Sequence, residues 1–373
     1  MLDVVDLFCG AGGLSHGFEL TGAFRIRAGI DSYARAMETH GRNHPHVAKS
    51  LRGALDVTEL DPSEVASAAG GRVQVIVGGP PCQGFSHAGP RLRDDPRNQM
   101  VLEYLRFVEA IRPAAFVMEN VSGLLTTAQS RKGELIEELQ ENYARLGYAT
   151  TWRVLNSVDF RVPQKRRRLI LVGIQGTKAF EFPESPCGSE ERLFSFPERV
   201  QTVSEALDDM PSPIADDPQP YDQDPRTWLQ RFLRRGSNAL HNHLQTKHSE
   251  DVLERIRLQR QGTRLYPSWN HSWFRLDPEL PSPAVKENHR APFVHHREHR
   301  ATSPRECARL QTFPDRFVFS GTKTDQLIQI GNAVPCLLAA HIATALATQL
   351  GVRVPQPWQA DSNPALAAEV EAV

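Results

Sequence analysis

Short apolar runs alternate with helical patterns over the first 175 residues, and this alternation constrains the fold more than any other feature of the chain. The expected strands are Leu2–Phe8, Phe24–Ile30, Val73–Val77, Ala115–Met118 and Leu169–Gly173, and the expected helices are Leu14–Thr21, Ser32–Asn43, Asn98–Ile111 and Gly133–Leu146. Ser32 is the expected N-cap of its helix. Strands that alternate with helices predict an α/β fold with a doubly wound, mostly parallel sheet.

The alternation stops near Gly176 and resumes near Ser303, which indicates an α/β domain interrupted by an irregular segment. Residues 184–225 hold 11 acidic and 2 basic residues, whereas residues 226–300 hold 14 basic and 7 acidic residues together with eight histidines. A basic face can bind a polyanion although the whole chain is nearly neutral, with 43 Lys and Arg against 44 Asp and Glu. Two solvated surfaces of opposite sign would give the same pattern.

In the irregular segment, only Ser249–Gln261 has a clear helical pattern, and Pro335–Leu350 is the expected closing helix. The five cysteines are scattered and form no CxxC pair, which favours free thiols in a reducing compartment. No signal peptide is expected at the start, and no run approaches the ~18 apolar residues that span a membrane. We therefore expect a soluble, cytoplasmic protein that contacts no membrane.

Metal binding is not expected from the histidines of the basic segment. His241 and His243 flank Asn242, but no cysteine or carboxylate lies at ligand spacing. The sequence therefore predicts no metal site.

The glycine-rich stretch Asp6–Gly13 has the order strand, tight turn, helix start, which is typical of nucleotide-binding sites. The dinucleotide fingerprint requires glycine where Ser15 stands, so a nicotinamide cofactor is disfavoured. Asp31, at the end of the next strand, suits a ribose hydroxyl pair, and Phe8 could stack on a base. Asp56 ends a possible strand and could accept from an adenine amino group, although a helix cap or a surface acid would look the same. An adenosine without a pyrophosphate, as in S-adenosylmethionine, fits this set.

A rigid turn, Pro80-Pro81-Cys82, follows the apolar run Val73–Val77 and two glycines. Ligands of open α/β sheets bind beyond the carboxyl ends of the strands, and the prolines leave this thiol little backbone freedom. A lone cysteine on a loop is also compatible with a structural role. Glu119 follows another expected strand, and a run of arginines precedes the strand Leu169–Gly173. The strand-end cysteine, glutamate and arginine are expected on one rim of the sheet.

Six sequence blocks occur in a recognisable order: DLFCGAGG at 6–13, GGPPCQGFS at 78–86, MENV at 118–121, QKRRR at 164–168, RECARLQTFP at 305–314 and QIGNAVP at 329–335. On these blocks the chain resembles the cytosine-C5 DNA methyltransferase family of bacterial or phage type. The resemblance implies a class I, Rossmann-like methyltransferase fold. It also implies a catalytic and cofactor-binding domain at 1–175, a target-recognition domain at 176–300 and a return to the catalytic domain at 301–350. The Pro- and Ala-rich composition of the end of the chain predicts a flexible tail at 351–373.

The resemblance assigns catalytic roles to Cys82, Glu119, Arg166 and Arg168. Cys82 would add to C6 of a flipped-out cytosine and so make C5 nucleophilic, which is covalent catalysis. Glu119 would bind N3 and the exocyclic amine of that cytosine. The two arginines, at alternate positions of an extended segment, would contact the pyrimidine carbonyl and the active-site acid or phosphate, while Arg167 would face away.

The cofactor set implied by the resemblance is Phe8, Gly10, Gly12, Gly13, Leu14, Asp31, Asp56, Pro80, Asn332 and Val334, for S-adenosylmethionine and its product S-adenosylhomocysteine. The expected DNA contacts are Gln83, Ser86, Arg97, Gln164, Arg231, Arg234, Arg235, Arg257, Arg260 and Arg264, with Arg275 a further candidate. Residues 83–98 resemble a loop that closes over DNA. The expected partners are double-stranded DNA and a cognate restriction endonuclease, and the expected state is a monomer.

Three alternatives remain open. A relative with the same framework could methylate tRNA, although the 125-residue segment 176–300 favours a dedicated DNA reader. A decayed, non-enzymatic DNA-binding relative is disfavoured because Cys82, Glu119 and both arginines are present. A thiol hydrolase needs a histidine base, for which His87 is the candidate, but it has no use for an adenosine site.

Overall fold

The computed structural model describes residues 1–47, 51, 53–81, 99–125, 134–187, 199–266, 273–286 and 293–355. The chain forms two compact units. Unit 1 takes Met1–Asn156, Arg167–Glu184 and the described residues from Ala339 onward, and unit 2 takes Ser157–Arg166 and Ser185–Leu338. Both units are assembled from segments that are distant in sequence.

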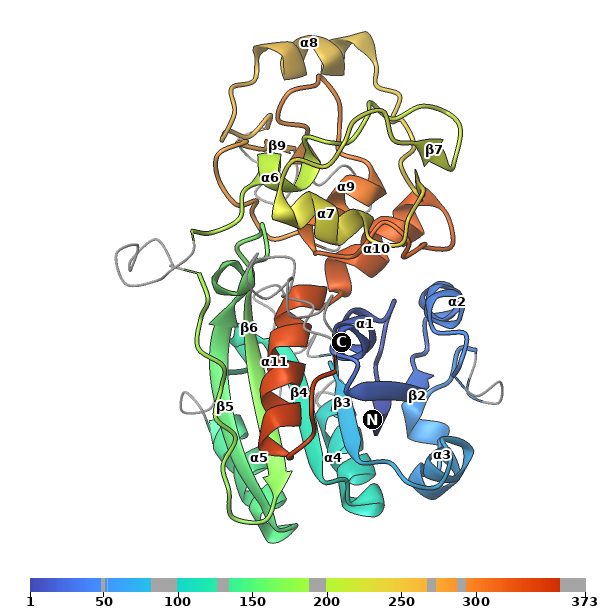
Figure 1. Cartoon of the computed structure of the whole chain (residues 1–373), viewed down its shortest axis with the longest axis vertical. Coiled ribbons are helices and arrows are strands. Elements are labelled where there is room, and N and C mark those ends of the chain that lie inside the picture. Colours follow the sequence, from blue (N-terminus) through green and yellow to red (C-terminus); the bar gives the residue numbers. More distant parts are fainter. Residues whose placement is uncertain are drawn as a thin grey trace, which may run out of the picture. The chain divides into compact units, whose positions relative to one another are not determined.

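Unit 1 is built on a six-stranded sheet (Figure 1). In spatial order the strands are β2 (Phe24–Ile30), β1 (Leu2–Leu7), β3 (Val75–Gly78), β4 (Ala115–Val121), β6 (Arg167–Gln175) and β5 (Tyr148–Asn156). The first four strands pair in parallel, and β6 runs antiparallel to both β4 and β5. This arrangement confirms the predicted doubly wound, mostly parallel sheet.

Strand β5 was not predicted from the sequence. It is an edge strand with a mostly half-buried surface, and it carries Thr150, Thr151 and Arg153 among its apolar residues. A strand of this kind lacks the continuous apolar run that marks the buried parallel strands.

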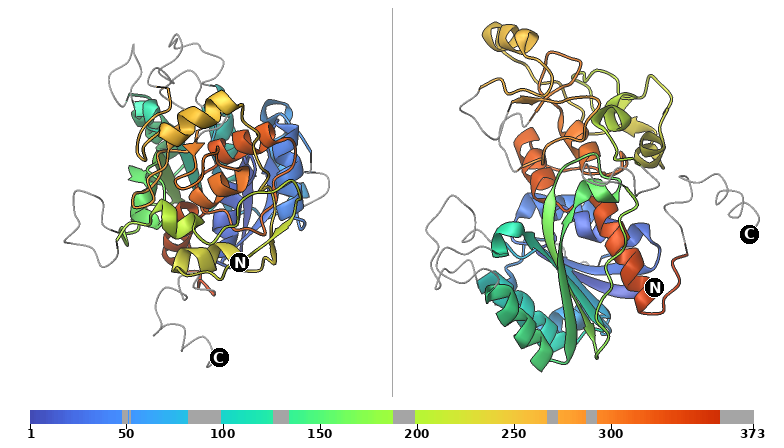
Figure 2. Two further views of the ribbon diagram at one scale, coloured as in Figure 1. Left: turned by 90° about the horizontal axis from the view of Figure 1, so that it is seen from above. Right: turned by 90° about the vertical axis from the view of Figure 1, so that its left-hand side faces the viewer.

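Helices cover both faces of the sheet. They are α1 (Gly13–Leu20), α2 (Ala34–Asn43), α3 (Pro62–Ala68), α4 (Gln99–Ile111), α5 (Glu134–Arg145) and α11 (Cys336–Gln349). The right-hand view of Figure 2 shows α11, in red, on one side of the sheet and α4 and α5, in teal, on the other. The core on the α4 and α5 side centres on Tyr104, Phe107, Phe116 and Tyr143, all fully buried. Burial of aromatic side chains of this size is a large source of stability.

Two local predictions in this unit are wrong. Ser32 does not cap α2: Tyr33 is the N-cap residue, and its backbone N–H is bound by the carboxylate of Asp31 instead. Asp56 does not end a strand. It caps the short 3₁₀ helix η2 (Val57–Glu59) by accepting from the N–H of Thr58 at 3.0 Å, as in the helix-cap alternative.

Unit 2 contains short elements joined by irregular chain. Its helices are η6 (Ser157–Phe160), α6 (Val203–Leu207), α7 (Trp228–Arg234), α8 (Glu250–Leu258), α9 (Pro304–Leu310) and α10 (Lys323–Asn332). Two-residue strands pair β7 (Gln219–Pro220) with β8 (Ala239–Leu240), and β9 (Phe274–Arg275) with β10 (Phe293–Val294).

Capping boxes begin several of these short helices. In α6 and α7, Thr202 and Thr227 each accept a hydrogen bond from the N–H three residues on, and Glu205 and Gln230 bond back to the cap. Both helices are too short for a clear periodic pattern, which is why the sequence predicted neither. The QIGNAVP block at 329–335 is helical in its first part, since α10 continues through Asn332.

Within the part of the chain that the structure describes, one helical stretch is long and apolar enough to cross a membrane by length and composition alone. It covers Lys323–Gln349, and 83% of the tested window is buried inside the protein. A buried apolar helix of this kind is also what a protein core requires.

Candidate functional site

Four parallel strands of unit 1 end in one row. The pairing register places Leu7 opposite both Ile30 and Gly78, and Gly78 opposite Met118. The residues that follow these positions therefore share one edge of the sheet. The chain passes from β1 to β2 on one side of β1 and then crosses to β3 on the other side, so the strand order reverses at β1. Such a switch point is where open α/β sheets bind ligands.

The glycine-rich loop after β1 is tied to the carboxylate after β2. Gly10 N–H donates to Asp31 Oδ2 at 2.9 Å, and Tyr33 N–H donates to Asp31 Oδ1 at 2.8 Å. Burial raises the pKa of Asp31, and these two donors oppose that shift. Phe8 and Gly12 both have positive φ, 57° and 100°. The loop therefore takes a shape that glycine favours, and Asp31 holds it against the next strand.

A buried polar chain lies under this loop. Ser15 Oγ donates to Asp6 Oδ2 at 2.6 Å and lies 3.1 Å from His40 Nε2. All three side chains are buried, and burial raises the pKa of Asp6 to about 7. His40 also packs against Gly29, where an added Cβ would lie 2.4 Å from the ring. Ser15 therefore links Asp6 to His40, and it does so at the position where the dinucleotide fingerprint has glycine.

The proline turn after β3 is attached to β4. Asn120 Nδ2 donates to the carbonyl oxygen of Pro80 at 3.1 Å, and Asn120 is 3% exposed. Cys82, the residue to which this turn leads, lies outside the described residues, as do Gln83, Ser86 and Arg97. Sequence reasoning did not select Asn120, although it stands beside Glu119 in the MENV block and could have been found there.

Glu119 forms an ion pair with Arg168. Arg168 Nε lies 2.7 Å from Glu119 Oε1, and both side chains are mostly buried. The pair forms because β6 begins at Arg167 and runs antiparallel to β4, with Arg168 opposite Val121. Gly79 leaves room for this carboxylate, since a Cβ there would lie 3.0 Å from Glu119 Oε2. Of the sequence-predicted catalytic residues, Glu119 and Arg168 are therefore in contact.

Arg166 lies in unit 2 and has different partners. Its guanidinium donates to the carbonyl oxygens of Val285 at 2.7 Å and Gly331 at 2.8 Å, and the residue is 2% exposed. Arg166 immediately precedes β6, which starts at Arg167, and its expected shared face with Arg168 stays a prediction. Arg167 is exposed, as expected.

Gln164 was expected to contact DNA, but it is fully buried. Its Nε2 donates to Leu310 O and Gln311 Oε1, both at 3.1 Å, and its Oε1 accepts from Val285 N–H at 3.0 Å. Gln311 Nε2 in turn donates to Ile330 O at 2.8 Å. These bonds join three of the six sequence blocks inside unit 2. The expectation that Gln164 contacts DNA is therefore wrong.

The remaining predicted cofactor residues are dispersed. Gly13 and Leu14 begin α1 and are buried. Asp56 is exposed, and the Thr58 N–H that it accepts lowers its pKa. In unit 2, Asn332 is exposed at the last position of α10, and the buried Val334 follows it.

The arginines predicted to contact DNA fall into two groups. Arg234 and Arg275 are engaged within unit 2: Arg234 lies 3.3 Å from Asp209 and over the ring of Tyr221, and Arg275 donates to Ile256 O at 2.8 Å. These contacts contradict a free DNA-reading role for Arg275 and Arg234. The second group is exposed and consists of Arg231, Arg235, Arg257, Arg260 and Arg264.

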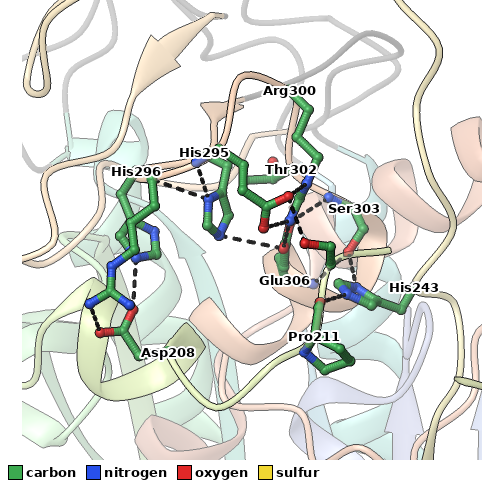
Figure 3. A network of polar contacts seen from close by, with 12 residues as sticks. Asp208, Pro211, His243, His295, His296, Arg300, Thr302, Ser303 and Glu306 are labelled. Carbon is green, nitrogen blue, oxygen red and sulfur yellow. Dashed lines mark hydrogen bonds and ion pairs between the residues drawn. The ribbon is translucent and has the colours of Figure 1, made fainter. Parts of the chain in front are cut away.

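Buried ion pairs fix the chain between β10 and α9 (Figure 3). Arg300 donates to both oxygens of Glu306, at 2.7 and 2.9 Å, and to Glu298. Burial opposes ionisation of Glu306, but the charges of Arg300 and His295 hold its pKa well below the usual range. His243 uses its two ring nitrogens on Ser303 Oγ and Pro211 O, so its contacts are accounted for without a metal.

The chain is similar in sequence to known DNA methyltransferases. The model of the C-5 cytosine-specific DNA methylase family matches residues 2–348. Type II methyltransferase M1.HphI of Haemophilus parahaemolyticus is 35% identical, with 92% of this chain and 86% of that protein covered. M.DdeI of Desulfomicrobium norvegicum is 31% identical, with 92% and 88% covered.

Among solved structures, a prophage-encoded E. coli protein described as a DNA modification methyltransferase superposes with a TM-score of 0.76 at 28% identity. The match covers 94% of this chain and all of that one. S. pombe Dnmt2 shares the fold at 20% identity, with a TM-score of 0.61 over 94% of this chain and 99% of its own. The match of the family model over nearly the whole sequence shows that this chain belongs to the C-5 cytosine-specific DNA methylase family.

Proposed function

We propose that this DNA cytosine methyltransferase acts through a transient covalent bond between Cys82 Sγ and C6 of a cytosine flipped out of duplex DNA. The observation that carries the proposal is the alignment of strand ends in unit 1. It brings the Asp31-bound glycine loop, the proline turn before Cys82 and the Glu119–Arg168 pair to one edge of the sheet.

The loop residues fit the adenosine part of S-adenosylmethionine, which supplies the methyl group. Gly10 and Gly12 place no side chain between the loop backbone and a ligand. Each Asp31 oxygen accepts one backbone N–H and keeps a further lone pair for a ribose hydroxyl. Phe8, Gly13, Leu14, Asp56, Pro80, Asn332 and Val334 are the other residues that we propose to line this pocket.

The protein's own groups act on the cytosine. The Cys82 thiolate adds to C6, and the electron pair of the C5–C6 bond becomes available at C5 for the incoming methyl group. Glu119 binds the N3 and amino edge, and Arg168 keeps that carboxylate in place. Loss of the C5 proton then restores the double bond as the C6–S bond breaks and releases Cys82. Each bond made to the enzyme is therefore broken within one turnover.

Arg166 is better explained as a positioning residue. Two of its hydrogen bonds go to backbone carbonyls of unit 2, one of them in the GNAVP block. We propose that it fixes the turn that carries Asn332 and Val334.

DNA recognition is proposed to reside in residues 176–300. The exposed arginines Arg231, Arg235, Arg257, Arg260 and Arg264 would contact phosphates or base edges, together with Gln83, Ser86 and Arg97 of the proposed closing loop. Because the curated relatives are named Type II methyltransferases, we also propose a cytoplasmic role in restriction–modification, beside an endonuclease that reads the same site.

The covalent step can be tested by trapping. Duplex DNA that contains 5-fluorocytosine should give a denaturation-resistant protein–DNA adduct in the presence of S-adenosylmethionine, because fluorine cannot leave C5 as a proton does. Cys82→Ser should abolish the adduct and turnover, while Cys187→Ser, a matched change at another, buried cysteine, should retain both. Turnover by Cys82→Ser would overturn the mechanism, and preferential methylation of tRNA over duplex DNA would overturn the proposed substrate.

A further inference from the structure

A carboxylate and two imidazoles of unit 1 converge at the junction of α1 and α2. Glu19 lies near the end of α1, and His44 and His46 follow α2. Glu19 Oε2 lies 2.8 Å from His44 Nδ1, and Glu19 Oε1 lies 2.6 Å from His46 Nε2. One ligand atom from each residue lies within 4.8 Å of the others.

Two of these side chains are held in position by their surroundings. His44 has no exposed side-chain surface, and its ring centroid lies 4.5 Å from that of His40. Glu19 Oε1 also accepts from the N–H of Ile26 on β2 at 3.2 Å. His46 is 41% exposed and forms the solvent side of the cluster. The cluster is therefore preorganised on one side and open to an incoming ion on the other.

The charge distribution also favours a cation. Glu19 supplies a carboxylate, and a neutral imidazole is the form in which histidine binds a metal.

We propose that Glu19, His44 and His46 form a binding site for one zinc ion, with water completing the coordination. Two imidazoles and a carboxylate form a donor set that suits zinc better than magnesium or calcium, which prefer oxygen ligands. Zinc bonds of 2.0–2.1 Å in tetrahedral geometry place neighbouring ligand atoms about 3.4 Å apart. The observed separations of 2.6 and 2.8 Å would open slightly, and the ligand atoms already lie within 4.8 Å of one another.

The site is separate from the residues proposed for methyl transfer, although it lies behind the glycine-rich loop. An added Cβ at Gly12 would lie 2.9 Å from His44 Nε2. A bound ion would therefore join the end of α1 to the segment after α2 and hold His44 against the loop. Its role would be structural, with no part in bond making.

Zinc binding by the full-length chain tests the proposal. After chelator treatment and desalting, the protein should bind one Zn²⁺ in competition with a zinc indicator, and Mg²⁺ should not compete. Glu19→Gln and His46→Ala should each weaken zinc binding at least tenfold. His299→Ala, which removes another exposed histidine, should leave the affinity unchanged.

Substitution with Co²⁺ gives an independent readout of the ligand set. The wild-type chain should show visible absorption typical of tetrahedral cobalt, and His46→Ala should lose it. Circular dichroism of the variants would show that the fold is retained. Wild-type protein without a one-to-one zinc site, or variants that bind as tightly as wild type, would show the cluster to be only an ion pair. Neither readout depends on methyl transfer, so failure here would leave the proposed function untouched.

Discussion

At the scale of single residues, the proposed chemistry depends on side chains that are fixed by neighbours on the adjacent strand. Arg168 on β6 holds Glu119 on β4, and Asn120 on β4 holds the carbonyl of Pro80 after β3. A buried polar group that loses its hydrogen-bond partner costs roughly 1–3 kcal/mol. Both interactions should therefore matter, one for the position of the Glu119 carboxylate and the other for the geometry of the turn at Pro80.

Arg168→Met should lower kcat/KM for DNA methylation by about 10²-fold, because Glu119 loses the cation that orients and stabilises it. Arg167→Met is the matched control, since Arg167 is the exposed neighbour on the same strand, and it should change kcat/KM less than about twofold. Steady-state methylation with tritiated S-adenosylmethionine measures both. Equal effects of the two changes would remove Arg168 from the site.

Asn120→Asp should lower kcat by about tenfold or more while leaving the affinity for S-adenosylmethionine within about twofold. The change keeps the size of the side chain but removes the N–H that binds Pro80 O. A lower rate of adduct formation with 5-fluorocytosine DNA would locate the effect at the thiol turn. An unchanged trapping rate, with kcat intact, would leave Asn120 a purely structural residue.

At the scale of elements, the start of α1 combines an unusual backbone conformation with a close contact. Gly12 has φ of +100°, and a Cβ there would meet the ring of His44 at 2.9 Å. Gly147 has a similar φ of +84°, but a Cβ there would meet nothing within 4 Å. Alanine substitutions at these two glycines therefore separate the cost of the backbone conformation from the cost of displacing the glycine-rich loop.

Gly12→Ala should weaken S-adenosylmethionine binding at least tenfold by displacing the loop from Asp31 and His44. Gly147→Ala should carry only the backbone cost of roughly 1–2 kcal/mol, with unchanged cofactor affinity. Isothermal titration and urea unfolding measure the two quantities. The same cofactor affinity in both variants would argue against a tightly packed cofactor loop.

The network between β10 and α9 should make stability depend on pH. Burial, with the charges of Arg300 and His296, lowers the pKa of His295 from 6.5 to about 4, although Glu306 opposes the shift. The unfolded chain therefore binds a proton more readily between pH 6.5 and 4. The stability from neutral His295 is present above pH 6.5 and is lost as the pH falls towards 4, by at most about 3 kcal/mol.

His295→Gln should reduce the loss of unfolding free energy between pH 7 and pH 4.5, because glutamine does not titrate. His299→Gln, at an exposed position, should keep the wild-type difference. Urea denaturation at the two pH values measures this difference in unfolding free energy. If the His295→Gln variant lost as much unfolding free energy between the two pH values as the wild type, the acid sensitivity would belong to other groups.

At the scale of the whole molecule, the near-neutral chain confines its excess positive charge to residues 226–300. Of the seven arginines in this segment that were predicted to contact DNA, five are exposed, whereas Arg234 and Arg275 are engaged in internal interactions. DNA affinity should therefore depend on a few side chains of unit 2 rather than on the net charge.

Replacing Arg231, Arg235 and Arg260 together by glutamine should weaken DNA binding and reduce the slope of log Kd against log salt. The reduction should be about 0.9 for each DNA phosphate that these arginines neutralise in the wild-type complex. Arg145→Gln, an exposed change on α5 of unit 1, should leave the slope unaltered. Fluorescence anisotropy over a range of salt concentrations measures this. An unchanged slope in the triple variant would place the phosphate-binding side chains elsewhere.

The sequence by itself determined the α/β class, the parallel strands β1 to β4 and the motifs at their ends. Buried parallel strands are continuous apolar runs, and ligand-binding residues follow them at the turn, so both signals are local. The edge strand β5 and the short helices α6 and α7 lack such a signal, because their stability comes from neighbours and caps.

Only the tertiary structure decided what each polar side chain contacts. Arg166 and Arg168 are two residues apart, yet one binds carbonyls of unit 2 and the other binds Glu119. Gln164 is buried although four charged residues follow it at 165–168, and Asn120 holds a turn 40 residues away. Hydrogen-bond partners are set by register and packing between distant segments, and no local pattern of residues contains that information.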